Sequence, residues 1–153
     1  MEQAGRVNTA SDHDCFGCGE RNPIGLRLKF FRRNGTVEAQ FCPEKTHEGY
    51  VHLLHGGIVA TLLDEAMSWA VIDGGHLAMT AKMEVTYRKP VPVGEPLTVM
   101  GKVSRDRRRA VEASGELRGP DGTVLASSTG LFIRVSEEQQ RAWEARYLGM
   151  TGH

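Results

Sequence analysis

One continuous segment, from Gly56 to Asp73, constrains the fold more than any other part of the chain. It is rich in Ala and Leu, contains no proline, and is followed by Gly74 and Gly75, as is typical of a helix and its C-terminal stop. At about 100° per residue, apolar side chains cover well over half of its circumference. We therefore predict a long helix that is largely enclosed by the rest of the fold.

A narrow stripe of small and polar residues interrupts this apolar surface. Its members are Gly57, Thr61, Asp64 and Ser68, with Glu65 at the edge. One interpretation is a solvated face, but solvated helix faces usually carry Lys, Glu and Arg. Small residues instead allow another backbone to approach, so we favour a buried contact.

Segments with strand periodicity flank the predicted helix. Residues 25–31 and 36–41 alternate apolar and polar around Asn34-Gly35, a strong signal for a two-residue hairpin. After the helix, the segments with strand character are 79–87, 96–103, 110–117 and 123–135. Two strands, one helix and four strands predict an α+β domain with one long helix against one antiparallel sheet.

Three regions follow from these patterns. We expect a flexible N-terminal arm over residues 1–12, a domain over residues 13–135, and a short helix with a tail over residues 136–153. Ser136 and Gln139 form a capping-box pattern at the start of that last helix.

Composition excludes several function classes. The 153 residues suit one domain, and 19 basic against 19 acidic residues give no global charge that would favour nucleic acid or an anionic membrane. No apolar run is long enough to span a bilayer, and the polar start does not resemble a signal peptide. Three cysteines do not suit a disulfide framework, so we expect a cytoplasmic protein.

The predicted helix begins at His55-Gly56-Gly57, where its first N–H groups have no partner within the helix. Glycines let a ligand oxygen approach these groups at the positive end of the helix dipole, although two glycines alone also suit an ordinary turn. Asp64, among apolar neighbours, is partly desolvated and suits a base or nucleophile.

The spacing of these groups has a geometric consequence. Gly57 and Asp64 are separated by roughly 10.5 Å along the helix at about 1.5 Å per residue. An oxyanion donor and a nucleophile must both reach one carbonyl group within about 3 Å. If both act, the helix must pair antiparallel with a second copy, which predicts a homodimer with two shared sites.

From about Cys15 to Val135 the chain resembles the hotdog-fold thioesterases, in the acyl-CoA thioesterase group that includes the phenylacetate-pathway enzymes. The most specific match is His55-Gly56-Gly57-Ile-Val-Ala-Thr-Leu-Leu-Asp64-Glu65-Ala66. Shorter matches are Cys15-Phe-Gly-Cys18-Gly19, Asn22-Pro23-Ile-Gly25-Leu26, Tyr87-Arg-Lys-Pro90 and Gly94-Glu95. The resemblance implies a hotdog fold, in which a curved antiparallel sheet wraps a long central helix, and a homodimer that often pairs again into a homotetramer.

The resemblance also implies roles for residues. The Gly57 N–H would bind the thioester carbonyl, with His55 and Gly56 shaping the entrance, and Asp64 of the partner would attack or activate a water. Thr80 matches a hydroxyl that orients this water, although an ordinary strand threonine fits equally well. Many relatives have a water-holding Asn or Gln before the glycines, whereas this chain has Glu48 and Gly49, which are the candidate substrate-binding residues of that loop. Ser68, one helical turn after Asp64 in the same polar stripe, is a further candidate for substrate binding.

A basic rim would suit the phosphates of coenzyme A. Residues 102–109 carry five cations and one acid, including Arg107 and Arg108, and Arg88 and Lys89 add two more cations. A solvated hairpin tip is the alternative interpretation. The segment is short and lacks interleaved aromatic residues, which disfavours nucleic acid.

The Cys15-x-x-Cys18 pair has several possible roles. With His13, Cys42, His47 and His52 it offers ligands for zinc, but the second half of the spacing is irregular. A redox pair is another possibility. We favour buried structural thiols and no metal.

The favoured function is hydrolysis of an acyl-CoA thioester, without a cofactor because coenzyme A belongs to the substrate. An acyl-CoA-binding module without turnover is the alternative, since a fold alone does not make an enzyme. A dehydratase is disfavoured because its motifs are missing, and the absence of Gly-x-Ser-x-Gly excludes a small α/β hydrolase.

Overall fold

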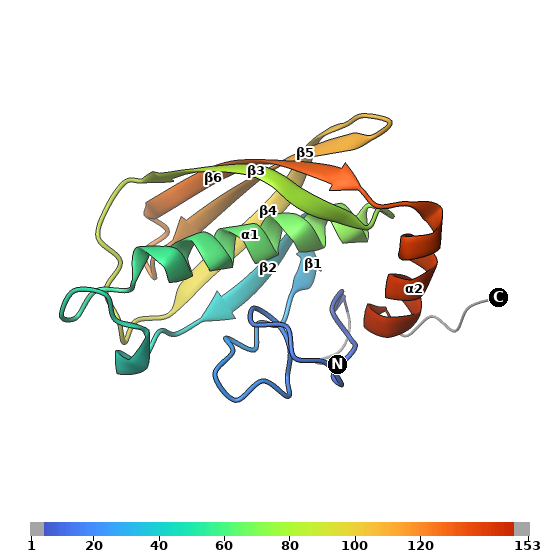
Figure 1. Ribbon diagram of the computed structural model, residues 1–153. Helices are drawn as coiled ribbons and strands as arrows, with labels where there is room; N and C mark the ends of the chain where they lie inside the picture. The colour runs from blue at the N-terminus through green and yellow to red at the C-terminus, as the bar shows by residue number, and fades with distance from the viewer. Residues whose placement is uncertain (1–4, 149–153) are drawn as a thin grey trace.

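A computed structural model describes residues 5–148 of the chain. It has the predicted α+β architecture and the hotdog fold, in which the long helix α1 lies across a curved six-stranded sheet (Figure 1). The α1 helix spans Gly56–Asp73, as predicted, and Gly74 caps its C-terminus. Met67 and Trp69 are buried core residues on α1. No helix in the described part of the chain is long and apolar enough to cross a membrane.

The sheet is antiparallel throughout and has the order β1-β2-β4-β5-β6-β3. Its strands are β1 (Phe31–Arg33), β2 (Thr36–Phe41), β3 (Ala78–Tyr87), β4 (Leu97–Asp106), β5 (Ala110–Arg118) and β6 (Val124–Arg134). A short 3-10 helix, η1 (Lys45–His47), and the C-terminal helix α2 (Glu137–Tyr147) complete the fold. The strand order leaves β3 at one edge, beside α1.

The hairpin and the last helix begin as predicted. Asn34 and Gly35, with φ of 48° and 79°, join β1 to β2. Both angles are positive, as a tight two-residue hairpin turn requires. Ser136 caps α2 by accepting a hydrogen bond from the Gln139 N–H at 3.1 Å.

The first predicted strand is wrong over most of its length, because only Phe31 of residues 25–31 belongs to β1. The alternation correctly predicted one buried face, formed by Leu26, Leu28 and Phe30. The Leu26 and Leu28 N–H groups donate, however, to the carbonyls of Phe16 and Gly17 in the N-terminal loop. Alternation indicates burial on one side, but it does not identify the hydrogen-bonding partner.

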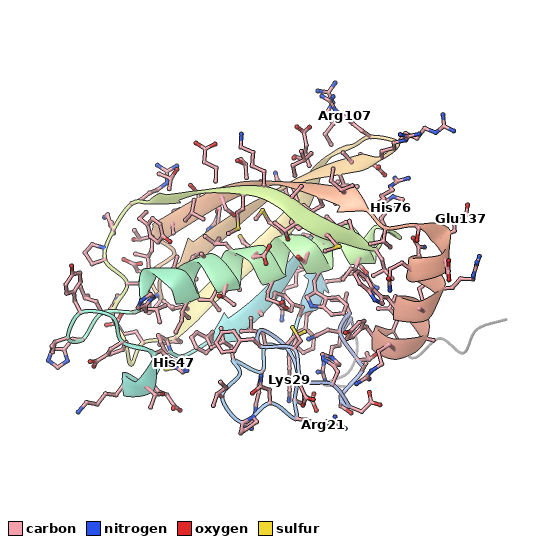
Figure 2. All side chains as sticks on the ribbon, viewed as in Figure 1. Arg21, Lys29, His47, His76, Arg107 and Glu137 are labelled. Atoms are coloured by element: carbon pink, nitrogen blue, oxygen red, sulfur yellow. The ribbon has the colours of Figure 1, made fainter. Side chains whose placement is uncertain are left out.

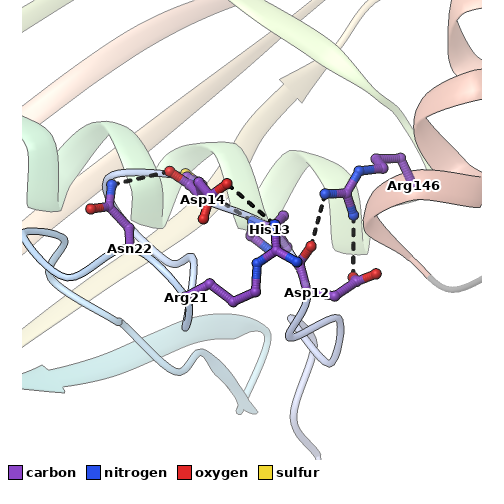
Figure 3. Close-up of polar contacts among 7 residues, drawn as sticks. Asp12, His13, Asp14, Arg21, Asn22 and Arg146 are labelled. Carbon is purple, nitrogen blue, oxygen red and sulfur yellow. Dashed lines mark hydrogen bonds and ion pairs between the residues drawn. The ribbon is translucent and has the colours of Figure 1, made fainter.

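Residues 5–12 make hydrogen bonds and an ion pair with the rest of the fold. Asn8 is buried, donates to the Leu28 carbonyl and accepts from the Phe30 N–H, both at 2.7 Å. Arg146 of α2 donates to the Asp12 carbonyl at 2.8 Å and pairs with its carboxylate (Figure 3). Residues 1–4 lie outside the described part, and the flexible arm over residues 1–12 stays a prediction. The domain boundaries at residues 13 and 135 stay a prediction.

Glycines in the sheet let α1 pack closely against it. A Cβ at Gly101 of β4 would lie 2.3 Å from the Ala66 carbonyl oxygen of α1. Gly115 of β5 and Gly130 of β6 are similarly crowded by Leu63, Ser128, Phe132 and Met67. Because these glycines have no side chain, α1 lies close to the sheet, and this packing fixes the position of its polar stripe.

Candidate active site

The start of α1 is capped by its own preceding residue. The Gly57 N–H donates to His55 Nδ1 at 2.8 Å, and the Ile58 and Val59 N–H groups donate to the His55 carbonyl. His55, Gly56 and Gly57 are all exposed. A ligand oxygen therefore reaches the Gly57 N–H only if the His55 ring moves away, a condition that the sequence does not reveal.

The end of β3 meets this helix start. The Tyr87 hydroxyl donates to the Gly56 carbonyl at 2.7 Å. Arg88 and Lys89 follow directly, and their N–H groups both donate to the Leu125 carbonyl. The Arg88 guanidinium donates to the Ser127 hydroxyl at 3.0 and 3.2 Å. Two of the predicted rim cations therefore lie at the end of the fold where α1 begins.

The loop that precedes the glycines also lies against the helix start. The His55 N–H donates to the His47 carbonyl at 3.0 Å, which brings Glu48 and Gly49 close to the entrance. A Cβ at Gly49 would lie 3.1 Å from the His55 Cα. These two predicted substrate-binding residues thus neighbour His55 in space.

Asp64 and Thr80 form the second part of the candidate site. The Thr80 hydroxyl donates to Asp64 Oδ1 at 2.7 Å. A register shift between Thr80 and Lys82 marks an irregularity in the pairing of β3 with β6, immediately beside this contact. Such irregularities re-aim side chains at sheet edges. The hydroxyl orients one carboxylate oxygen of Asp64.

The polar stripe of α1 is only partly covered by the described residues of the same chain. Asp64, Thr61 and Ser68 are half-buried, whereas the opposite side of the helix is enclosed. The neighbouring edge strand β3 is also open, with Met79 59% and Tyr87 54% exposed. Figure 1 shows α1 and β3 side by side. Stripe and strand form one continuous surface, which we call the open edge.

Arg107 and Arg108 lie at the other end of the fold. They are exposed in the turn between β4 and β5, next to Asp106, which pairs with His76 at 2.9 Å. In Figure 2 the labelled Arg107 and His76 lie toward the side of the fold where α1 ends, and His47 lies toward the side where it begins. Within one chain, the structure does not bring this basic turn together with Arg88 and Lys89.

Glu65 is a candidate functional residue that the sequence did not single out. Burial raises its pKa to about 8. The Cys15 thiol lies 3.4 Å from one of its carboxylate oxygens, and a hydrogen bond with the Cys18 thiol lowers the pKa of Cys15 to about 5. Among the described residues only Cys15, Cys18 and Glu65 bring possible ligand atoms together. His13 lies beside them, but its Nδ1 accepts a hydrogen bond from the Cys15 N–H at 3.3 Å.

Comparisons with known proteins point to one family. Residues 52–126 match the family model described as the thioesterase superfamily. A bovine (Bos taurus) acyl-coenzyme A thioesterase, THEM4, is 30% identical over 132 residues, which are 84% of this chain and 54% of the relative. The chain spans about half of the length of the curated relatives that it matches.

Solved structures support the same fold. A crystal structure of a thioesterase superfamily protein is 31% identical with a TM-score of 0.75, covering 78% of this chain and 59% of that one. A Streptococcus mutans protein bound to acetyl CoA has a TM-score of 0.67 at 20% identity, covering 71% and 89% of the two chains. At that identity the second likeness shows the fold alone.

Proposed function

Because this chain belongs to the thioesterase superfamily, we propose that it hydrolyses an acyl-CoA thioester to the free acid and coenzyme A, at a site shared by two subunits. The observation that carries the proposal is the hydrogen bond from Thr80 to Asp64, which orients a carboxylate on the open edge. The bovine relative is named an acyl-coenzyme A thioesterase, and the streptococcal protein binds acetyl CoA. The name of the bovine relative supports this substrate class.

The proposed reaction uses few groups. Thr80 holds Asp64 Oδ1 and leaves Oδ2 to deprotonate a water, or to attack the thioester carbonyl directly. When water attacks, the new C–O bond gives a tetrahedral oxyanion; the C–S bond then breaks, and the leaving sulfur of coenzyme A takes the proton that Asp64 had accepted. When Asp64 attacks directly, the thiolate leaves a mixed anhydride, which water cleaves to the free acid and the Asp64 carboxylate, and the proton released from that water goes to the thiolate. The Gly57 N–H of the other subunit stabilises the oxyanion once the His55 ring has swung away. No cofactor is needed.

The shared site is supported by distance and by exposure. Asp64 is roughly 10.5 Å along the helix from Gly57 of the same chain, too far for one carbonyl group to reach both. Antiparallel pairing of two open edges would place Asp64 of each subunit beside the partner's helix start and would complete the unpaired edge of β3. It would also carry the basic turn with Arg107 and Arg108 toward the partner's Arg88 and Lys89, as a rim for phosphates.

Light scattering tests the assembly. We expect a particle of twice or four times the mass of one chain, because both the homodimer and the homotetramer contain the paired open edges. A purely monomeric protein at assay concentration would contradict the shared site.

A panel of acyl-CoA thioesters that differ in chain length and aromaticity tests the activity. A rate of free-thiol release above the uncatalysed rate supports hydrolysis. Comparison of the rates across the panel identifies the preferred acyl group. Fractionation of the source cells tests the cytoplasmic location, which stays a prediction.

One observation favours a second function, an acyl-CoA-binding module without turnover. The Gly57 N–H already donates to His55, so the proposed oxyanion donor is occupied. If acyl-CoA raises the melting temperature without thiol release, this alternative replaces hydrolysis.

Removing the Thr80 hydroxyl should slow the reaction moderately. Thr80→Val keeps the size of the side chain but loses the bond to Asp64, and we expect kcat to fall about 10-fold, equivalent to about 1.4 kcal/mol. Thr86→Val is the matched control, on the same strand and exposed, with no side-chain hydrogen bond to another described residue. Equal kcat values for the two variants would remove Thr80 from the mechanism.

A further inference from the structure

Cys15, Cys18 and Glu65 form a compact cluster in which Glu65 directly follows Asp64 on α1. The two sulfurs and a carboxylate oxygen lie within 4.8 Å of one another. The cysteines belong to one turn, closed by the Gly19 N–H donating to the Cys15 carbonyl at 2.8 Å, and Glu65 comes from the middle of α1. The N-terminal loop and the central helix therefore meet at three chemically reactive groups.

Two glycines make this approach possible. A Cβ at Gly17 would lie 2.2 Å from Glu65 Cγ, so any other residue there would push the carboxylate away from the thiols. A Cβ at Gly19 would lie 2.4 Å from the Cys15 nitrogen and would open the turn. The pattern Cys-Phe-Gly-Cys-Gly thus encodes both the turn and the space for the carboxylate.

The carboxylate is incompletely paired. Glu65 Oε2 is fully buried and has no hydrogen-bond partner among the described residues. None of the ion pairs found in that part of the chain includes Glu65. A buried carboxyl group with an orphaned oxygen is costly unless a donor or a cation compensates it. The orphaned oxygen therefore leaves an unfilled bonding position in the cluster, which a hydrogen-bond donor or a cation would fill.

We propose that Cys15, Cys18 and Glu65 bind a thiophilic divalent metal ion, zinc being the best match, which links the N-terminal loop to α1. Two thiolates with one carboxylate suit zinc, whereas calcium and magnesium require oxygen ligands. A sulfur at about 2.3 Å and an oxygen at about 2.0–2.2 Å from a tetrahedral zinc ion lie roughly 3.5–3.7 Å apart. The distance of 3.4 Å from the Cys15 sulfur to Glu65 Oε1 is close to that spacing.

The half-exposed side of Cys15 leaves the fourth position to a water molecule. The site revises the expectation of buried structural thiols without a metal. The third ligand is neither Cys42 nor a histidine but a carboxylate 50 positions after Cys15, which only the fold brings near.

Metal analysis tests the site without reference to catalysis. The background is Cys42→Ser, which removes the exposed cysteine outside the cluster. Protein dialysed against zinc without chelator, then against metal-free buffer, should retain about one zinc per chain. Cys15→Ser and Glu65→Gln in this background should each lower the retained zinc at least 10-fold, with circular dichroism confirming that they are folded. Cobalt in place of zinc should show thiolate-to-metal charge-transfer absorption.

Chelation adds a stability readout. A strong chelator should lower the melting temperature of the Cys42→Ser protein but leave that of Glu65→Gln unchanged. The proposal is overturned if the Cys42→Ser protein retains no zinc and both remaining thiols react freely with a thiol reagent. It is also overturned if Cys15 and Cys18 form a disulfide, seen as a mass decrease of two hydrogens. Full zinc retention by Glu65→Gln would also overturn it. Zinc retention is independent of the proposed hydrolysis, so the two proposals fail separately.

Discussion

Replacing Asp64 by Asn is expected to lower kcat for acyl-CoA hydrolysis by roughly 10²–10⁴-fold, the range associated with loss of a positioned general base. The amide neither accepts the proton of the attacking water nor attacks the thioester. Its carbonyl oxygen still accepts the hydrogen bond from the Thr80 hydroxyl. The fold and the assembly should therefore be preserved, and the loss should appear in kcat.

The matched control is Asp73→Asn, the same substitution at the C-terminal end of the same helix. Asp73 pairs with Arg32 at 2.6 Å, away from the candidate site. Because exposed ion pairs contribute about 0–1 kcal/mol, this variant should retain kcat and lose little stability. Parental turnover by Asp64→Asn, measured by thiol release, would show that the catalytic assignment is wrong.

The second large effect concerns stability. Gly101→Ala should lower the free energy of unfolding by about 3 kcal/mol, the upper part of the usual range for overpacking. The added Cβ would lie 2.3 Å from the Ala66 carbonyl oxygen and 2.5 Å from its carbon. Both are backbone atoms of α1, so no side-chain rotation relieves the clash. The helix must move away from β4, which also displaces the nearby Asp64.

Thermal unfolding followed by circular dichroism measures this effect. For a domain of this size, about 3 kcal/mol corresponds to a decrease of roughly 6–12 °C in the melting temperature. Gly119→Ala is the control, because a Cβ there would meet its nearest neighbour at 3.5 Å, an ordinary contact. That variant should remain within about 0.5 kcal/mol of the parent. Similar melting temperatures for both variants would contradict the role given to Gly101.

Local signals predicted the elements well. The bounds of α1 followed from its apolar surface and from Gly74, and the first hairpin from Asn34-Gly35. These features depend on residues only a few positions apart. The strand expected over residues 25–31 was wrong over most of its length. The alternation correctly predicted which side chains are buried, but the hydrogen-bonding partner of this segment is the N-terminal loop rather than a strand.

For the candidate site, too, the sequence could predict relations within one helix but not contacts between distant segments. The glycines at the helix start and Asp64 could be predicted because they lie on one helix, whose regular rise converts spacing into distance. Thr80 was a candidate from resemblance alone, and its contact with Asp64 needed the path of β3 beside α1. The capping of Gly57 by His55 depends on a side-chain rotamer, which no spacing predicts.

By itself, the sequence determined the central helix, the succession of helix and strands along the chain, and the separation of Gly57 from Asp64 on which the proposed shared site rests. Only the tertiary structure brought Glu65 to Cys15 and Cys18, and only it put Arg107 and Arg88 at opposite ends of the fold. The physical reason is the range of the interactions. Helix and turn formation depend on neighbouring residues, whereas contacts between distant segments depend on the path of the whole chain and on where a glycine leaves room.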